Sequence, residues 1–251
     1  MRYALISDIH ANLPALDAVL ADIAAGEPVG GTCHLGDLVG YAPWPNETVA
    51  RLRAEAIPGV AGNYDSTVAT DYKHCGCQYE DPVQEALSHA SYEWTRAQVT
   101  PDTKALLAAL PFRLDLLPLG GHRAGPRVIL VHGTPTLNTL YWTEDRPDDF
   151  CRKMATHAGA RPGDVIAFGH THKPWHRVVD GIHLVNTGSV GRPKDGDWRA
   201  GYVVLTIGED AVTVEFRRVE YDVALAMRTI EASGLPKEFA VYLESGGTRL
   251  S

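Results

Sequence analysis

The feature that most limits the fold is a series of short apolar runs, each bounded by turn or polar residues. Five runs have the length and composition of buried strands: YALIS at 3–7, RVILV at 127–131, DVIAF at 164–168, IHLVN at 182–186 and YVVLTI at 202–207. Segments with helical spacing separate several of these runs. A chain in which strands and helices alternate in this way is expected to form an α/β fold.

The expected helices begin at recognisable start signals. Asn46 and Asp81 are good N-cap residues, and Pro82 suits the first turn of a helix. We expect helices over residues 13–26, 46–56, 81–99, 146–159 and 222–233. The segment 202–219 alternates twice around Gly208-Glu209-Asp210, which predicts a β-hairpin. Without an internal repeat or a clear linker, one domain over 1–251 is expected, with 66–120 as a candidate helical cap or lid region.

Composition excludes several classes of protein. The 251 residues are 45% hydrophobic and 22% charged, which is ordinary for a globular protein with a substantial core. Lysine and arginine number 23 and aspartate and glutamate 31, so the formal net charge is −8. This balance argues against a broad nucleic-acid surface. It leaves room for a small anionic substrate, because bound metal ions can make a pocket locally positive.

The apolar segments and the cysteines bear on location. The first apolar run stops at Asp8, too early for the core of a signal peptide, and no run has the length of a membrane span. The four cysteines lack the spacing of a disulfide framework. We therefore expect a cytoplasmic protein without a membrane partner.

Side chains that can bind metals recur at the ends of the apolar runs. In open α/β sheets, ligands bind beyond the carboxyl ends of the strands, so these side chains are expected to converge. Two pairs have a spacing of two residues, which in extended chain places both side chains on one side. The candidates are Asp8, His10, Asp37, Asn63, His132, His170 and His172.

The donor set indicates the kind of metal. Imidazole with carboxylate suits iron, manganese, zinc or nickel, and the absence of thiolates disfavours a structural zinc site. Seven donors fill two metal sites if one aspartate bridges them. Two divalent cations, two carboxylates and one hydroxide leave a charge of about +1, a suitable setting for a phosphate ester.

Six motifs together resemble a known family. SDIHAN at 7–12, LGDLVG at 35–40, AGNYDS at 61–66, LVHGTP at 130–135, FGHTHKP at 168–174 and NTGSVGRPKDG at 186–196 occur in this order. They resemble the calcineurin-like metallophosphoesterase superfamily, in the style of its compact prokaryotic, phosphodiesterase-like branch. The resemblance implies a four-layer α/β/β/α sandwich with mixed sheets.

The resemblance also implies a ligand set and a mechanism. Asp8, His10, Asp37 and His172 would hold the first metal, and Asp37, Asn63, His132 and His170 the second, with Asp37 bridging. A hydroxide that bridges the metals would attack phosphorus in line while the metals stabilise the phosphoryl charge. Asp37 and Asn63 would thus be catalytic as well as ligating. The expected substrate is a small phosphate ester.

Tyr64 departs from the family pattern, in which histidine often follows the asparagine of the Gly-Asn motif. That histidine is usually assigned to the leaving group or the transition state. Tyrosine, with an unperturbed pKa of about 10, is a weak general acid at neutral pH. We therefore expect diesters with good leaving groups as substrates. The alternative is that Tyr64 is a packing residue and another group donates the proton.

Several other residues near the motifs have two possible roles each. Asn12 is a candidate substrate contact or a helix cap, and Arg192 is a candidate phosphate clamp or a surface arginine. Tyr141 and Trp142 could wall a cleft or simply pack. His74 and the Cys75/Cys77 pair are more readily explained as loop residues than as site residues.

Competing functions remain at this point. A phosphomonoesterase, a protein or nucleotide phosphatase, and a non-catalytic binding scaffold of the same fold are the alternatives. Scaffold relatives tend to lose ligands, whereas all seven donors are present here, so catalysis is favoured. No G-x-S-x-G, Walker A or G-x-G-x-x-G motif occurs.

Overall fold

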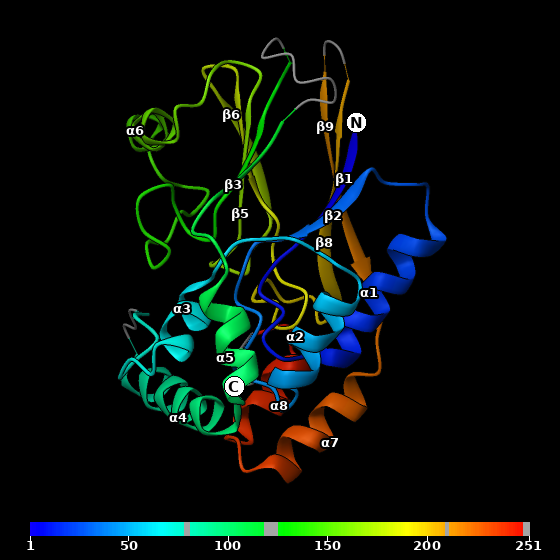
Figure 1. The fold of residues 1–251 in the computed structure, drawn as a ribbon, viewed down its shortest axis with the longest axis vertical. Helices are drawn as coiled ribbons and strands as arrows, with labels where there is room; N and C mark the ends of the chain where they lie inside the picture. Colours follow the sequence, from blue (N-terminus) through cyan, green and yellow to red (C-terminus); the bar gives the residue numbers. More distant parts are fainter. Residues whose placement is uncertain (78–80, 118–124, 209–210, 248–251) are drawn as a thin grey trace.

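Two β-sheets form the centre of the molecule (Figure 1). The computed structural model describes residues 1–77, 81–117, 125–208 and 211–247. Sheet A has the strand order β2 (Gly31–His34), β1 (Arg2–Ile6), β8 (Ala200–Ile207) and β9 (Val212–Val219). Sheet B has the order β3 (Leu114–Leu116), β4 (Val128–Leu130), β5 (Val165–Phe168), β7 (Ile182–Asn186) and β6 (Trp175–Val179). Both sheets are mixed, as expected.

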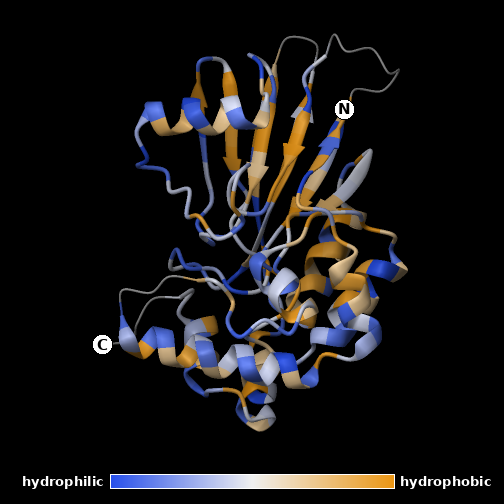
Figure 2. Cartoon of the chain, turned by 60° about the vertical axis from the view of Figure 1, so that its left-hand side comes forward, coloured by the Kyte–Doolittle hydropathy of each residue, from blue (hydrophilic) through white to orange (hydrophobic). Residues whose placement is uncertain are grey.

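The sheets face each other across an apolar core, and helices cover their outer faces. Alternate residues of a strand point to opposite faces. Leu5 and Leu130 accordingly pack between the sheets, whereas Ile129 and Phe168 face outward under α6 (Asp148–Ala158). On the far side, α1 (Leu13–Ala25) contacts β8 and β9 of sheet A. The order α6, sheet B, sheet A, α1 is the predicted α/β/β/α sandwich (Figures 1 and 2).

The remaining helices of the described chain gather below the strand tips (Figure 1). They are α2 (Pro45–Ala54), α3 (Asn63–Ala69), α4 (Pro82–Gln98), α5 (Pro101–Ala108), α7 (Val223–Ser233) and α8 (Glu238–Glu244). Helix α3 contacts both α4 and α5, and α7 contacts α8. Much of the segment 66–120 is therefore helical where the structure describes it. Its role as a cap or lid stays a prediction. Among the described residues, none of the helices combines the length and apolar character that a bilayer crossing requires.

The local predictions have different outcomes. Asp81 caps α4 by accepting a hydrogen bond from Val83 N at 3.0 Å, as predicted. The two strands of the predicted hairpin pair antiparallel as β8 and β9, while Glu209 and Asp210 of its turn lie outside the described residues. The prediction that Asn46 caps α2 is wrong, because the helix begins at Pro45 with Trp44 in the cap position. The Asn46 side chain instead accepts a hydrogen bond from Thr100 N and donates one to Gln98 O. These bonds connect α2 to the end of α4 and the start of α5.

Candidate metal centre

The backbone at the strand tips adopts a conformation that non-glycine residues rarely take. The φ angle is 50° at Asp8, 49° at His10, 53° at Asp37, 66° at His170 and 60° at His172. A residue in this left-handed region costs about 1–3 kcal/mol and persists only where its surroundings impose it. Five such residues among the seven candidate ligands point to a site whose geometry is held against local preference.

Two glycines let the strand-tip loops approach one another closely. A Cβ atom at Gly62 would lie 2.0 Å from Asp37 Oδ1, and one at Gly169 would lie 2.2 Å from Asp8 Oδ2. Any side chain at these positions would displace a candidate ligand. The glycines of the AGNYDS and FGHTHKP motifs are therefore explained by contact with the two aspartates.

The candidate donors form two buried groups. Ligand atoms of Asp8, His10 and His172 lie within 4.8 Å of one another, as do those of Asp37, His132 and His170. Asp37 also connects the groups, because its Oδ2 lies 3.7 Å from His10 Nε2 and 3.5 Å from His132 Nε2. Residues from four separate segments of the chain are thus brought together.

Hydrogen bonds to backbone carbonyls orient the histidines. The Nδ1 atoms of His10, His132 and His172 donate to the carbonyl oxygens of Val39 (3.1 Å), Leu35 (2.8 Å) and Arg192 (2.5 Å), respectively. With Nδ1 protonated, the Nε2 atom carries the free lone pair. Fixing the tautomer in this way is typical of histidines that bind metals.

Two buried ligand atoms lack a hydrogen-bond partner in the described part of the chain. Asp8 Oδ1 and His170 Nε2 accept and donate no hydrogen bond there, although the other oxygen of Asp8 accepts from Ser7 Oγ at 2.6 Å and His170 N at 3.0 Å. Leaving a buried polar atom unsatisfied costs about 1–3 kcal/mol, and more for a charged group. One such atom lies in each group, so the residues fit a pair of divalent cations.

Burial dominates the protonation of the histidines. It lowers the pKa of His10 and of His170 to about 3, so both imidazoles are neutral and able to bind a metal at pH 7. His132 is the exception, since the attraction of Asp37 outweighs burial and raises its pKa to about 9. Without a cation, His132 and Asp37 therefore form a buried ion pair, and a cation would take the place of that proton.

Asn63 belongs with the second group, and a neighbouring loop orients it. Its Oδ1 lies 3.1 Å from His132 Nε2, while its Nδ2 donates to Cys75 O (2.9 Å) and Cys77 Sγ (3.2 Å). The amide oxygen is thereby turned toward the metal centre. The Cys75/Cys77 loop thus positions a candidate ligand, a role that its sequence did not indicate. His74 is exposed and accepts a bond from Gly76 N, as a loop histidine does.

Tyr64 lies in the core beside the site. Its ring packs against Tyr92 and edge-on against His10, with centroids 5.7 and 5.6 Å apart. Its hydroxyl lies 3.1 Å from Ser88 Oγ of α4. The backbone N–H of Tyr64 donates to Asp37 Oδ1 at 2.9 Å. This placement favours the packing interpretation of the side chain.

The remaining candidates divide between the site and the core. Asn12 caps α1 by accepting from Ala15 N, and its Nδ2 donates to Gly191 O and Tyr221 Oη. Tyr141 stacks on the His170 ring at 4.3 Å and so lies at the site. The interpretation of Trp142 as a cleft wall is wrong, because the residue is fully buried and stacks on Phe168 at 4.6 Å.

Two cations on one loop also lie at the centre. The guanidinium of Arg192 sits 4.0 Å above the Tyr41 ring, which packs edge-on against His10. Lys194 lies two residues further along; burial and the charge of Arg192 lower its pKa to about 7. The charge of Lys194 in turn lowers the pKa of His10, His170 and His172, which include members of both groups. Lys194 belongs to the NTGSVGRPKDG motif but was not among the residues predicted for the site.

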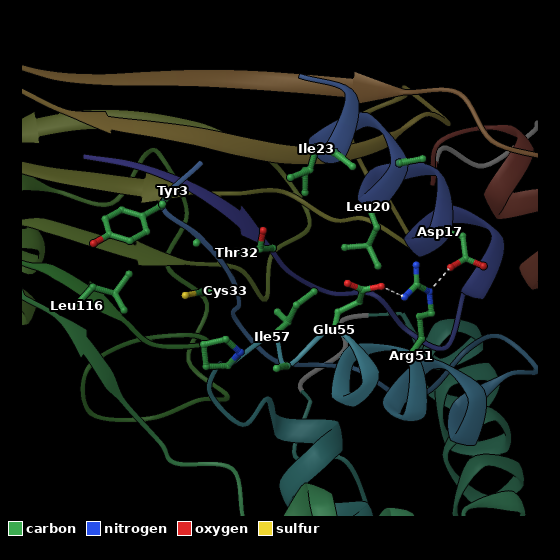
Figure 3. Close-up of a pocket in the computed structure, with 16 residues that line it drawn as sticks. Tyr3, Asp17, Leu20, Ile23, Thr32, Cys33, Arg51, Glu55, Ile57 and Leu116 are labelled. Atoms are coloured by element: carbon green, nitrogen blue, oxygen red, sulfur yellow. Dashed lines mark hydrogen bonds and ion pairs between the residues drawn. The ribbon is translucent and has the colours of Figure 1, made fainter. Parts of the chain in front are cut away.

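A cavity of about 750 Å³ lies elsewhere, beside the edge strand β2 (Figure 3). Apolar side chains of Leu20, Ile23 and Ile57 line it, and Arg51 at its rim pairs with Asp17 at 2.8 Å. None of the seven candidate ligands lines this cavity. Volume alone would therefore direct attention away from the chemistry.

Fold and site define the class of protein to which the chain belongs. An α/β/β/α sandwich with two buried Asp–His groups at its strand tips is the arrangement of a metal-dependent phosphoesterase, a hydrolase. The chain belongs to the calcineurin-like phosphoesterase superfamily, whose domain model matches residues 1–210.

Known proteins agree with this assignment. The chain is 32% identical to the uncharacterized protein MJ0912 of Methanocaldococcus jannaschii over 251 residues, which cover 93% of each protein. It is 31% identical over 110 residues to the probable metallophosphoesterase YsnB of Bacillus subtilis, covering 42% of this chain and 54% of that protein.

Solved structures show the same fold. A metallophosphoesterase from Sphaerobacter thermophilus superposes with a TM-score of 0.74 at 29% identity, covering 98% of this chain and 100% of that one. The hypothetical protein PH1004 from Pyrococcus horikoshii superposes with a TM-score of 0.81 at 21% identity, covering 99% of each chain. The predicted family and fold are therefore confirmed.

Proposed function

We propose that the protein hydrolyses small phosphodiesters with the help of two divalent cations. The observation that carries this proposal is the pair of unsatisfied buried atoms, Asp8 Oδ1 and His170 Nε2, one in each Asp–His group. A single cation would satisfy only one of the two groups. Manganese is the first metal to test, with iron, zinc and nickel as alternatives.

Each residue of the centre has a defined task in this proposal. Asp8, His10 and His172 hold one cation, Asn63, His132 and His170 hold the other, and the Asp37 carboxylate lies between the groups. The cations supply an ionised water near neutral pH and stabilise negative charge on the phosphoryl oxygens. The carbonyls of Val39, Leu35 and Arg192 keep the imidazoles directed inward.

The proposed preference for diesters rests on the position of the Tyr64 hydroxyl. The Tyr64 hydroxyl lies beside Ser88 Oγ, in the core under α4, rather than among the ligand atoms. A site with weak acid assistance favours esters whose leaving group departs without a proton. Arg192 remains the proposed phosphate contact. A substrate contact by Asn12 and the cytoplasmic location stay predictions.

The test is an assay of the metal-stripped protein with metals added back singly. Bis(p-nitrophenyl) phosphate, p-nitrophenyl phosphate, nucleotides and a phosphopeptide serve as substrates. We expect manganese to restore hydrolysis of the diester in preference to the others, and Asp37→Asn to abolish it. A preference for the monoester, nucleotides or the phosphopeptide would replace the diester proposal by the corresponding phosphatase. Inactivity with every metal and substrate would favour a scaffold.

A further inference from the structure

The loop that follows β7 carries two basic side chains, Arg192 and Lys194, that are not candidate metal ligands. Its backbone is hydrogen-bonded to a candidate ligand. Arg192 O accepts a hydrogen bond from His172 Nδ1 at 2.5 Å, and Lys194 N donates one to His172 O at 3.4 Å. The Arg192 guanidinium lies above the Tyr41 ring, and the charge of Lys194 lowers the pKa of His10, His170 and His172.

Neither cation has a carboxylate partner within 4 Å in the described ranges of the chain. The two acids of the same loop are used elsewhere: Asp195 pairs with Arg218, and Asp197 pairs with Arg199 at 2.7 Å. Asp195 is exposed, Asp197 and Lys194 are partly so, and Arg192 is 8% exposed. Both acids of the loop are thus paired with other arginines, whereas Arg192 is buried without a carboxylate partner among the described residues.

Residues after α8 also contact this loop. A Cβ atom at Gly247 would lie 2.7 Å from Lys194 Cα and 3.1 Å from Lys194 Cγ, and Gly196 N donates to Gly246 O at 3.0 Å. The turn after α8 thus packs against the stem of Lys194. This contact limits the conformations open to the Lys194 side chain.

The charge count then calls for more than one anionic group on the ligand. Two divalent cations, the two aspartates and an ionised water leave about +1, and Arg192 raises this to about +2; Lys194 adds up to one further charge when protonated. A simple diester contributes a single negative charge. Two adjacent cations without a partner repel each other until an anion binds between them.

We propose that Arg192 and Lys194 form a subsite for a second phosphate group of the substrate, next to the phosphate at the metal centre. The proposal rests on the proposed function and narrows it to phosphate esters that carry a further phosphate. Arg192 donates from its planar guanidinium and Lys194 from its ammonium group.

Binding of two matched probes that cannot be hydrolysed tests the subsite. Methylphosphonate carries one anionic group and methylenediphosphonate carries two. Calorimetry is performed on manganese-loaded protein freed of excess metal, and the metal content is measured again after each titration. Wild type is expected to bind the diphosphonate at least tenfold more tightly than the monophosphonate.

The variants are Lys194→Gln, Lys194→Arg and, as a matched control, Lys153→Gln on the exposed face of α6. Lys194→Gln is expected to weaken diphosphonate binding roughly tenfold or more, since a hydrogen bond to a charged group is lost, and to change monophosphonate binding less than twofold. Lys194→Arg keeps the charge and is expected to retain most of the preference. Lys153→Gln should behave as wild type.

Three results would overturn the subsite: no preference of wild type for the diphosphonate, unchanged binding in Lys194→Gln, or an equal loss of both probes in that variant. Because no turnover is measured, these results do not depend on the hydrolysis of any ester. A protein that shows the probe preference but cleaves no ester would refute the proposed function and leave the subsite standing.

Discussion

The metal centre at the strand tips and the cavity beside β2 differ in whether their charged side chains have partners. At the cavity rim, Arg51 pairs with Asp17 and Glu55, and all three side chains are a third or more exposed. At the centre, Asp8 is fully buried and one of its oxygens has no partner in the described part of the chain. The cavity satisfies its own charges, whereas the centre leaves charges that a ligand must satisfy.

This difference separates the cavity, lined by apolar side chains such as Leu20 and Ile23, from the metal centre. The centre combines left-handed backbone at Asp8, His10 and Asp37 with unsatisfied buried atoms, and both features cost stability. A fold retains such costs where function requires them. The predictions below compare the two regions.

The largest expected effect is on catalysis. Asp37→Asn removes the carboxylate that lies between the two groups, so kcat/KM for the preferred diester is expected to fall by about a thousandfold or more. Arg51→Gln at the cavity rim is the control and should stay within about twofold of wild type. Steady-state hydrolysis of bis(p-nitrophenyl) phosphate measures both. A comparable loss in Arg51→Gln would refute the contrast between the regions.

Metal binding should stabilise the fold. Manganese at a hundred times its dissociation constant contributes about 2.7 kcal/mol, which for a chain of this size is a rise in melting temperature of roughly 5–10 °C. The rise is expected in wild type and in Arg51→Gln but not in Asp37→Asn. Thermal unfolding followed by circular dichroism shows the result. An undiminished rise in Asp37→Asn would place the metal outside the centre.

Asp164 is a buried acid whose oxygens, unlike Oδ1 of Asp8, accept hydrogen bonds. Asp164 is 2% exposed and accepts from Arg127 N and Nη2 and from Arg161 N. These bonds hold its pKa below the usual value in spite of burial. Replacing it by asparagine leaves the arginine without its partner, so Asp164→Asn is expected to cost about 2 kcal/mol of unfolding free energy at pH 7.

The sign of the pH dependence follows from the lowered pKa of Asp164. Its contribution is fully present above the unfolded value of about 3.9 and is lost as pH falls through the folded value. The difference between wild type and Asp164→Asn should therefore be constant from pH 7 to 5 and shrink below pH 4. Urea unfolding at these pH values measures it. A difference that persists at pH 3 would contradict the ion pair as its source.

The smallest expected effect is a gain in stability at the centre. Asp8→Asn removes a buried charge whose Oδ1 has no partner among the described atoms. Without metal, the variant is expected to be more stable than wild type by about 1 kcal/mol, as is common for residues retained for function. Urea unfolding in a chelator tests this. A less stable variant would show that Asp8 has a mainly structural role.

The sequence by itself determined most of the strands, though not β2, β3 and β6, and the identity of the donors. Each apolar run predicts its strand through local composition, and parallel strands end at the same edge of a sheet, so Asp8 and Asp37 were expected to meet. Gly62 and Gly169 agree with this pattern, because a residue without a side chain permits close approach. The six motifs together were specific enough to predict the family and the four-layer fold.

Only the tertiary structure decided which way the aromatic and cationic side chains point. Trp142 and Tyr141 are neighbours in sequence, yet one stacks on Phe168 in the core and the other on His170 at the site. Likewise, Lys194 differs from an ordinary loop lysine only through its contacts with distant segments. The direction of a side chain depends on packing against residues far away in the chain. A local sequence pattern does not specify which residues those are.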